Sequence, residues 1–400
     1  MPPNRKTLPN TGLEAGLHKK GSPAMTALKT ASLAALMTAA LAGTALTTGT
    51  ALAADTVKIG YQLPLTGETA QYGQDFRKAA EIALTEFNAS GKPFKAEIVF
   101  EDSRSDAKEG TNIARKFVDD KAIVGVLGDF TSGVSMASAQ VYKDAGMPQL
   151  SQTASHPDYT KISKYQFRNI ATQAQEGPYN AKWMLSKGYK NIAVIAEQTD
   201  WGQSVVSGFT DGVKANGGTV VFSEFFNRGL KDYRSLISKL ERAKPDAIYT
   251  GFFYEDGAQF LRQVQQLGIK TPVYSTSAAY SPKLIELAGE AAEGVHLTSN
   301  FLPTDPAPHI QHFVTEWKAA SNGAVPGQFP AQAYDAVRIM LAAVEKAYPN
   351  PTREKVRDAL AETKDFAGVT GKTSFSADRE AEKELVKVEV KGGAFVPVAD

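Results

Sequence analysis

Two short clusters of hydroxyl side chains stand directly after apolar, strand-like runs of the sequence. The run at 122–127 leads into Thr131 and Ser132, and the segment 151–155 carries Thr153 and Ser155. Hydroxyls beside the free N–H groups of a helix N-terminus suit a carboxylate, because the unpaired donors and the helix dipole both favour negative charge. The alternative is that these residues only cap the helices that follow. Two clusters after neighbouring strands favour the anion site.

The loops of the later half carry aromatic side chains and few acids. Trp201 lies in the polar segment "TDWG" and Phe253 in "GFFYEDG". Aromatic rings suit the apolar part of a small ligand, whereas Tyr72 in "AQYG" and Phe253 can equally be core residues. Trp201 is less typical of a core, since it stands between Asp200 and Gly202.

Residue types that support catalysis or metal binding are scarce. The sequence has no cysteine, which excludes disulfides, thiolate metal sites and thiol nucleophiles. Its five histidines form no H-x-x-x-H pair, and no G-x-S-x-G, Walker or G-x-G-x-x-G motif follows a strand. No base is placed to activate the hydroxyls of "TSGVSMAS". We therefore expect no catalytic residue, no metal and no cofactor.

Alternating strand-like and helix-like segments are expected to position these loops. The helix patterns recur at i, i+3, i+4 spacing, as in Phe76, Ala79, Ala80 and Ala83. One helix is expected at 176–187 and strands at 123–127, 191–196, 219–226 and 247–251. Strands separated by single helices predict parallel sheets covered on both faces. The series restarts near Phe167, so we predict two similar α/β lobes. Ligands collect at the carboxyl ends of such strands.

The end of the chain carries two more amphipathic helix patterns and an alternating, strand-like sequence. This tail is short for a third domain, so we expect it to return and complete the earlier lobes. The predicted boundaries are a leader at 1–53, a first lobe at 54–172 plus 301–372, and a second lobe at 173–300 plus 373–400.

Charge and composition exclude nucleic acid as a partner. The whole chain has a formal net charge of +1, but the leader holds five basic residues and one acid, which leaves 39 basic and 42 acidic groups. A slightly acidic surface without a basic, aromatic-rich stripe is not typical of a nucleic-acid-binding protein.

The leader has the form of a secretory signal. Lys29 precedes an uncharged, small-residue apolar run, and Ala51 and Ala53 supply a small-x-small cleavage site. We expect export with cleavage near Ala53 and Ala54, and Met25 is an alternative start. Without cysteine the product is not a lipoprotein. The run is too rich in Gly, Ala and Thr for a good transmembrane anchor.

After the leader, in its strand-end loops and helices, the chain resembles the periplasmic solute-binding proteins of ATP-driven (ABC) importers, specifically the branched-chain amino-acid-binding group. The likeness runs from "VKIGYQLPLTGETAQYG" through "DAIYTGFFYEDGAQFLRQVQQLG" to "AYDAVRIM". The resemblance implies two α/β lobes joined by a three-stranded hinge, which close around a ligand. It also implies a monomer in the periplasm that delivers a small solute to a membrane permease and is not an enzyme.

The resemblance assigns roles to residues of both lobes. Ser132 in "DFTSG" matches the carboxylate-binding hydroxyl, and "QTAS" matches a second anchor loop. Tyr72, Trp201 and Phe253 match aromatic positions around the ligand. The remaining expected binding residues are Phe130, Thr131, Thr153, Ala154 and Ser155 from the first lobe.

Two departures leave the ligand class open. Gln173 and Ser277 stand where amino-acid-binding members of the family hold the ammonium group with acids. Glu255 is a possible replacement. An unpaired ammonium costs several kcal/mol to bury, so an aromatic or aliphatic acid, or a small amide, remains an alternative to a branched-chain amino acid. A ligand sensor for a membrane receptor is the alternative role.

Overall fold

Two sheets whose central strands are buried form the framework of the chain. The computed structural model describes residues 55–399, so the predicted leader and its cleavage site lie outside the described residues. The described residues form one compact unit. Within it, each sheet belongs to one lobe.

The first sheet is entirely parallel, in the order β2-β1-β3-β4-β5. Its strands are β1 (Asp55–Leu63), β2 (Phe94–Asp102), β3 (Ile123–Leu127), β4 (Gln149–Ser151) and β5 (Gln166–Arg168). All residues of β3 and β4 are buried. Helices α1 (Ala70–Ala89), α2 (Ala107–Asp119) and α3 (Ser132–Asp144) follow the first three strands.

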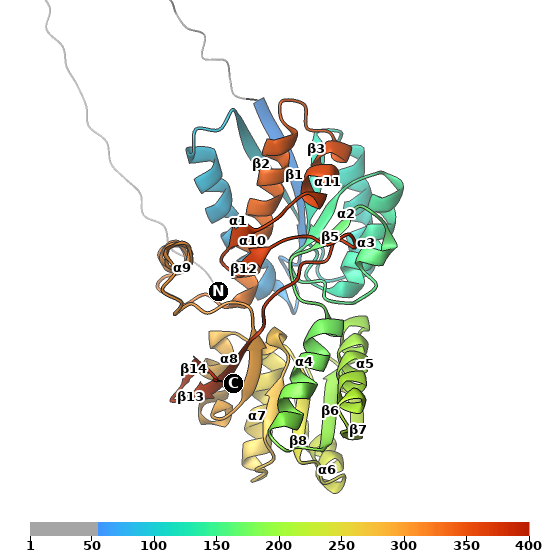
Figure 1. Cartoon of the computed structure of the whole chain (residues 1–400), viewed down its shortest axis with the longest axis vertical. Coiled ribbons are helices and arrows are strands. Elements are labelled where there is room, and N and C mark those ends of the chain that lie inside the picture. The colour runs from blue at the N-terminus through green and yellow to red at the C-terminus, as the bar shows by residue number, and fades with distance from the viewer. Residues whose placement is uncertain (1–54, 400) are drawn as a thin grey trace, which may run out of the picture. The chain divides into compact units, whose positions relative to one another are not determined.

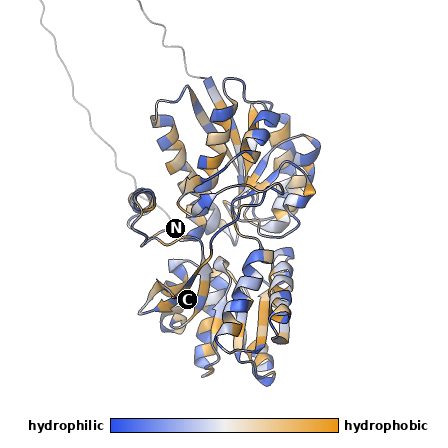
Figure 2. Cartoon of the chain, viewed as in Figure 1, coloured by the Kyte–Doolittle hydropathy of each residue, from blue (hydrophilic) through white to orange (hydrophobic). Residues whose placement is uncertain are grey.

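The second sheet has the order β14-β13-β10-β9-β8-β6-β7, with parallel pairing from β10 to β7. Its parallel strands are β6 (Asn191–Glu197), β7 (Thr219–Phe226), β8 (Ala247–Gly251), β9 (Val273–Ser275) and β10 (His296–Ser299). The associated helices are α4 (Gln173–Ser186), α5 (Asp200–Ala215), α6 (Arg234–Arg242), α7 (Tyr254–Gln266) and α8 (Pro282–Ala288). Strands β6 and β7 are mostly hydrophobic, and the surrounding helices carry hydrophilic residues as well (Figure 2).

The tail divides between the two lobes (Figure 1). Helices α9 (Pro308–Ala320), α10 (Gln328–Ala347) and α11 (Arg353–Ala361) return to the first lobe, where Arg353 donates to the Ile123 carbonyl over 3.1 Å. A small hairpin, β11 (Phe366–Gly368) and β12 (Gly371–Thr373), follows. Strands β13 (Val386–Lys391) and β14 (Ala394–Pro397) then form an antiparallel edge of the second sheet.

The chain therefore passes between the lobes three times, at 169–172, 300–307 and 374–385. The predicted fold, two α/β lobes with parallel sheets covered by helices and joined by a three-stranded hinge, is confirmed. The antiparallel edge of the second sheet was not predicted. The exact lobe boundaries stay a prediction.

No helix within residues 55–399 combines the length and apolar character needed to cross a membrane.

Candidate functional site

The loop between β3 and α3 forms one wall of the site. Gly128 has a φ of 95°, and a Cβ there would lie 2.0 Å from the Gln62 carbonyl oxygen, so only glycine allows the buried strand to turn at this point. Thr131 caps α3, because its hydroxyl accepts from the Val134 N–H at 3.4 Å. Ser132 is therefore not the cap. Its hydroxyl lies at the first turn of α3 and accepts from the His156 N–H at 3.3 Å.

The Asp129 side chain holds this loop in place through hydrogen bonds. Its Oδ1 accepts from the N–H groups of Phe130 (2.6 Å) and Thr131 (3.3 Å). The side chain is fully buried, and burial raises the pKa of Asp129 to about 6 despite these hydrogen bonds.

The loop after β4 supplies the second anchor of the first lobe. The Thr153 hydroxyl donates to the Phe130 carbonyl over 2.7 Å, which ties the two loops together. The Ser155 carbonyl accepts from the Gln173 N–H at 3.0 Å. Gln173 is the first residue of α4 because Thr172 and Gln175 form a capping box. The Gln173 side chain thereby reaches Ser155, with 3.4 Å between Nε2 and Oγ.

The second lobe supplies a mainly aromatic wall. Thr199 caps α5 by accepting from the Gly202 N–H. Trp201, the second residue of this helix, places its ring 4.8 Å from that of Phe253. Phe253 precedes α7, and Ser277 follows β9. Each of these residues lies at the carboxyl end of a parallel strand, as the sheet topology predicts for a ligand site.

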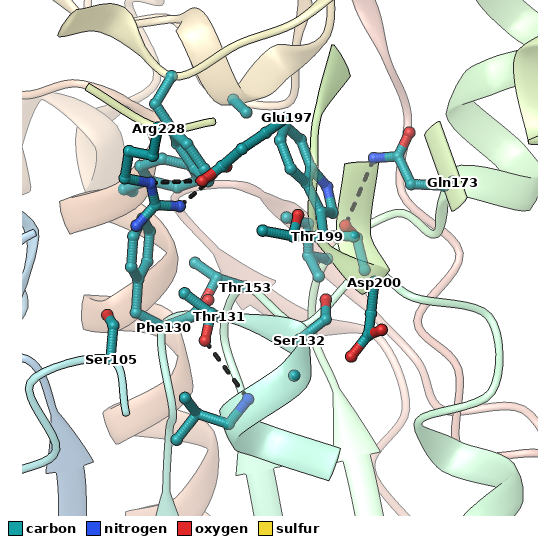
Figure 3. Close-up of a pocket in the computed structure, with 18 of the residues that line it drawn as sticks. Ser105, Phe130, Thr131, Ser132, Thr153, Gln173, Glu197, Thr199, Asp200 and Arg228 are labelled. Carbon is teal, nitrogen blue, oxygen red and sulfur yellow. Dashed lines mark hydrogen bonds and ion pairs between the residues drawn. The ribbon is translucent and has the colours of Figure 1, made fainter. Parts of the chain in front are cut away.

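Nine of the twelve predicted residues line a single cavity with a volume of about 370 Å³ between the lobes (Figure 3). They are Phe130, Thr131, Ser132, Thr153, Ser155, Gln173, Trp201, Phe253 and Ser277. Ten of the lining residues are labelled in Figure 3, where Ser132 and Thr131 face Glu197 and Arg228 across the cavity. Such a volume suits a small molecule.

Three predicted residues lie elsewhere. Tyr72 donates a 2.5 Å hydrogen bond to Glu255, and both line a neighbouring cavity of about 350 Å³. This bond joins the first lobe to the second. Ala154 is fully buried, its N–H donates to Ser151 and its carbonyl accepts from Arg168. The Ala154 backbone is therefore already paired within the protein.

An ion pair outside the set of predicted site residues lines the same cavity. Arg228 contacts Glu197 through Nε (2.6 Å) and Nη2 (2.9 Å), and its guanidinium lies 4.9 Å from the Phe253 ring centroid. Burial opposes the charge of the guanidinium, but the Glu197 carboxylate outweighs it and raises the pKa of Arg228. Their positions in the sequence could have indicated a place in the site, since Glu197 directly follows the apolar run 191–196 and Arg228 follows the strand 219–226.

A second acid lies just behind the cavity wall. The Glu176 carboxylate is 1% exposed and accepts from the Ser277 N–H (2.6 Å) and from the Gln173 side-chain amide (2.9 Å). Both of these donors line the cavity. Glu176 stands at the predicted start of helix α4 and was not among the predicted site residues.

Metal binding finds no support in the described part of the chain, where no group of three or more potential ligand side chains comes together.

Known proteins are similar over most of the chain. The model of a family described as "periplasmic binding protein" matches residues 56–394. The Leu/Ile/Val-binding protein homolog 1 of Brucella suis is 31% identical over 80% of this chain and 86% of its own length.

Solved structures agree with these matches. A chain from Rhodospirillum rubrum is 47% identical with a TM-score of 0.68, over 86% of this chain and all of its own. The substrate-binding protein LivJ of Streptococcus pneumoniae, solved in complex with isoleucine, is 26% identical with a TM-score of 0.78 over the same shares.

Proposed function

Since this chain belongs to the periplasmic binding protein family, we propose that it captures a small carboxylate-bearing solute between its lobes and delivers it to the permease of an ABC importer. One observation carries the proposal: residues predicted from both lobes line one cavity of ligand size. The bound solute then stabilises the closed state of the hinge, because it contacts both lobes only when they are closed.

The first-lobe wall is suited to the carboxylate. Ser132 and Gly133 lie at the N-terminus of the 13-residue helix α3, where unpaired N–H groups and the dipole favour an anion. The hydroxyls of Thr131, Ser132 and Ser155 add further donors. The apolar part of the ligand then packs against Trp201 and Phe253.

A branched-chain amino acid is the first candidate for the solute. Similar proteins carry names that specify leucine, isoleucine and valine, and LivJ was solved with isoleucine. The aromatic rings around the cavity support a second candidate, an aromatic carboxylic acid. The rings of Phe130 and Phe253 lie 5.2 Å apart, and Phe329 joins them in the cavity wall.

We further propose that the protein is exported, processed near Ala53 and Ala54, and acts as a monomer without enzymatic activity. The basic, then apolar leader and its small-x-small site support processing. Mass spectrometry of the secreted protein is expected to give an N-terminus at Ala54 or Asp55. Retention of residues 25–50 contradicts this part of the proposal.

A thermal-shift screen tests the solute class. Branched-chain amino acids, aromatic acids and small amides are added separately to the purified protein, and a ligand at 100 times its Kd stabilises the folded state by about 2.7 kcal/mol. We expect a clear rise in Tm with at least one carboxylate. A response to amides alone, or to no small solute, contradicts the proposal.

A further inference from the structure

We propose that Glu176 makes the Gln173–Ser277 side of the cavity selective for a positively charged group, such as the ammonium of an amino acid. The inference rests on the proposed function and deepens it, because it names the charge class of the solute. Glu176 acts as a positioning residue behind the cavity wall.

The Glu176 carboxylate is buried without a cation. Its three hydrogen-bond donors are all neutral: the Ser277 N–H, the Gln173 amide and the Thr298 hydroxyl, at 2.6 to 2.9 Å. Within residues 55–399 it takes part in no ion pair. Buried charges are normally paired, since an isolated one is costly in a medium of low dielectric.

The Glu176 carboxylate lies directly behind two residues of the cavity wall. Gln173 and Ser277 line the cavity, and they occupy the positions where the family resemblance predicts acids. The negative charge expected on the cavity surface therefore lies one residue deeper, and the same two residues hold it. A ligand cation against them supplies the charge that Glu176 lacks.

The other charged residues of the cavity do not compensate the negative charge of Glu176. Glu197 and Arg228 neutralise each other, and Asp200 adds a negative charge at an exposed position of the lining. The opposite wall offers hydroxyls and the N-terminus of α3. A zwitterion matches both walls, whereas an acid without an ammonium group brings its negative charge to a cavity whose second wall is already negative.

Calorimetric titration of matched ligand pairs tests the inference. Leucine is compared with 4-methyl-2-oxopentanoate, and phenylalanine with phenylpyruvate, on wild type and Glu176→Gln. We expect wild type to prefer the amino acid of a pair. Glu176→Gln is expected to weaken amino-acid binding at least tenfold and to leave the oxo acid equal or tighter. Glu241→Gln, which removes the same charge from an exposed site on α6, is the control and is expected to keep the wild-type ratio.

The outcomes separate the two proposals. A wild type that binds the oxo acid more tightly overturns the inference without any variant, so a Glu176→Gln protein that fails to fold does not remove the test. Equal loss of both ligands in Glu176→Gln also overturns it, because a structural role alone predicts equal loss, and the proposed function then stands. Binding of none of the four probes, together with no hit in the thermal-shift screen, contradicts the proposed function and the inference with it.

Discussion

At the scale of single residues, the loop before α3 separates two roles that the sequence left open. From the sequence, Ser132 is either part of an anion site or the cap of the helix that follows. The structure gives the cap to Thr131 and leaves the Ser132 hydroxyl at the cavity surface. The two neighbouring hydroxyls therefore provide a matched pair of substitutions.

Ser132→Ala is expected to weaken ligand binding by about 1.5–3 kcal/mol, the usual loss for a hydrogen bond to a charged group. The stability of the ligand-free protein is expected to change little. Thr131→Ala is expected to lower the unfolding free energy by about 1 kcal/mol through loss of the cap. Calorimetric titration and urea unfolding measure the two effects. A Ser132→Ala protein with unchanged affinity and reduced stability contradicts the assignment.

Asp129 makes stability depend on pH. Its folded pKa of about 6 lies above the usual value of 3.8, so the folded state binds a proton more readily than the unfolded state. The folded protein therefore gains stability as the pH falls through 6, and loses it as the pH rises. Between pH 7.5 and 5 we expect wild type to gain about 1 kcal/mol relative to Asp129→Asn. Parallel pH profiles from urea unfolding count against this account of Asp129.

At the scale of elements, long apolar runs were predicted well and short polar ones were not. Strands β7 and β8 begin and end at the predicted residues because their apolar runs have clear limits, although only β8 is buried along its whole length. Strand β10, with sequence HLTS, has no such run and was missed. Helix α4 begins at Gln173, three residues before the predicted start. The Thr172–Gln175 capping box was the available signal.

Site residues were likewise predicted only where a local sequence pattern indicates them. Hydroxyl and aromatic residues in strand-end loops were predictable, since the sheet topology gathers those ends. The ion pair of Glu197 with Arg228 and the bonds of Glu176 join residues far apart in the sequence, and no local pattern indicates which partners meet.

One buried ion pair ties an anchor loop to the third crossover. Arg168 donates to the carbonyls of Ala154 and His156, on either side of Ser155, and its guanidinium pairs with Glu380 at 2.7 Å. Glu380 lies in the segment 374–385. The geometry of the Ser155 loop therefore depends on a contact with the hinge.

Glu380→Gln is expected to lower the unfolding free energy by about 3 kcal/mol, because it leaves the fully buried Arg168 guanidinium without a counter-charge. Ligand affinity is expected to fall as well, through the Ser155 loop. Urea unfolding and titration measure both effects. Glu362→Gln, which breaks the exposed pair with Lys346, serves as control and is expected to change neither. Equal behaviour of the two variants is inconsistent with a coupling role for Arg168.

At the scale of the whole molecule, a series of weak motifs identified the family. No single segment is diagnostic, but their order along the chain predicted the periplasmic binding protein family, and the match over 56–394 confirms it. The same order predicted three passages between the lobes. What the sequence did not reveal is the direct contact between lobes, in which Tyr72 donates to Glu255 beside the cavity.

The central claim is that one solute is held by both lobes at once. Titration calorimetry of the strongest carboxylate from the screen, on wild type, Ser132→Ala and Trp201→Ala, tests it most directly. Ser132 lies in the first lobe and Trp201 in the second, and both line the cavity. We predict that each substitution weakens binding at least tenfold and that both proteins remain folded. Full affinity in Trp201→Ala, with loss only in Ser132→Ala, would mean that one lobe binds the solute alone and would contradict capture by closure.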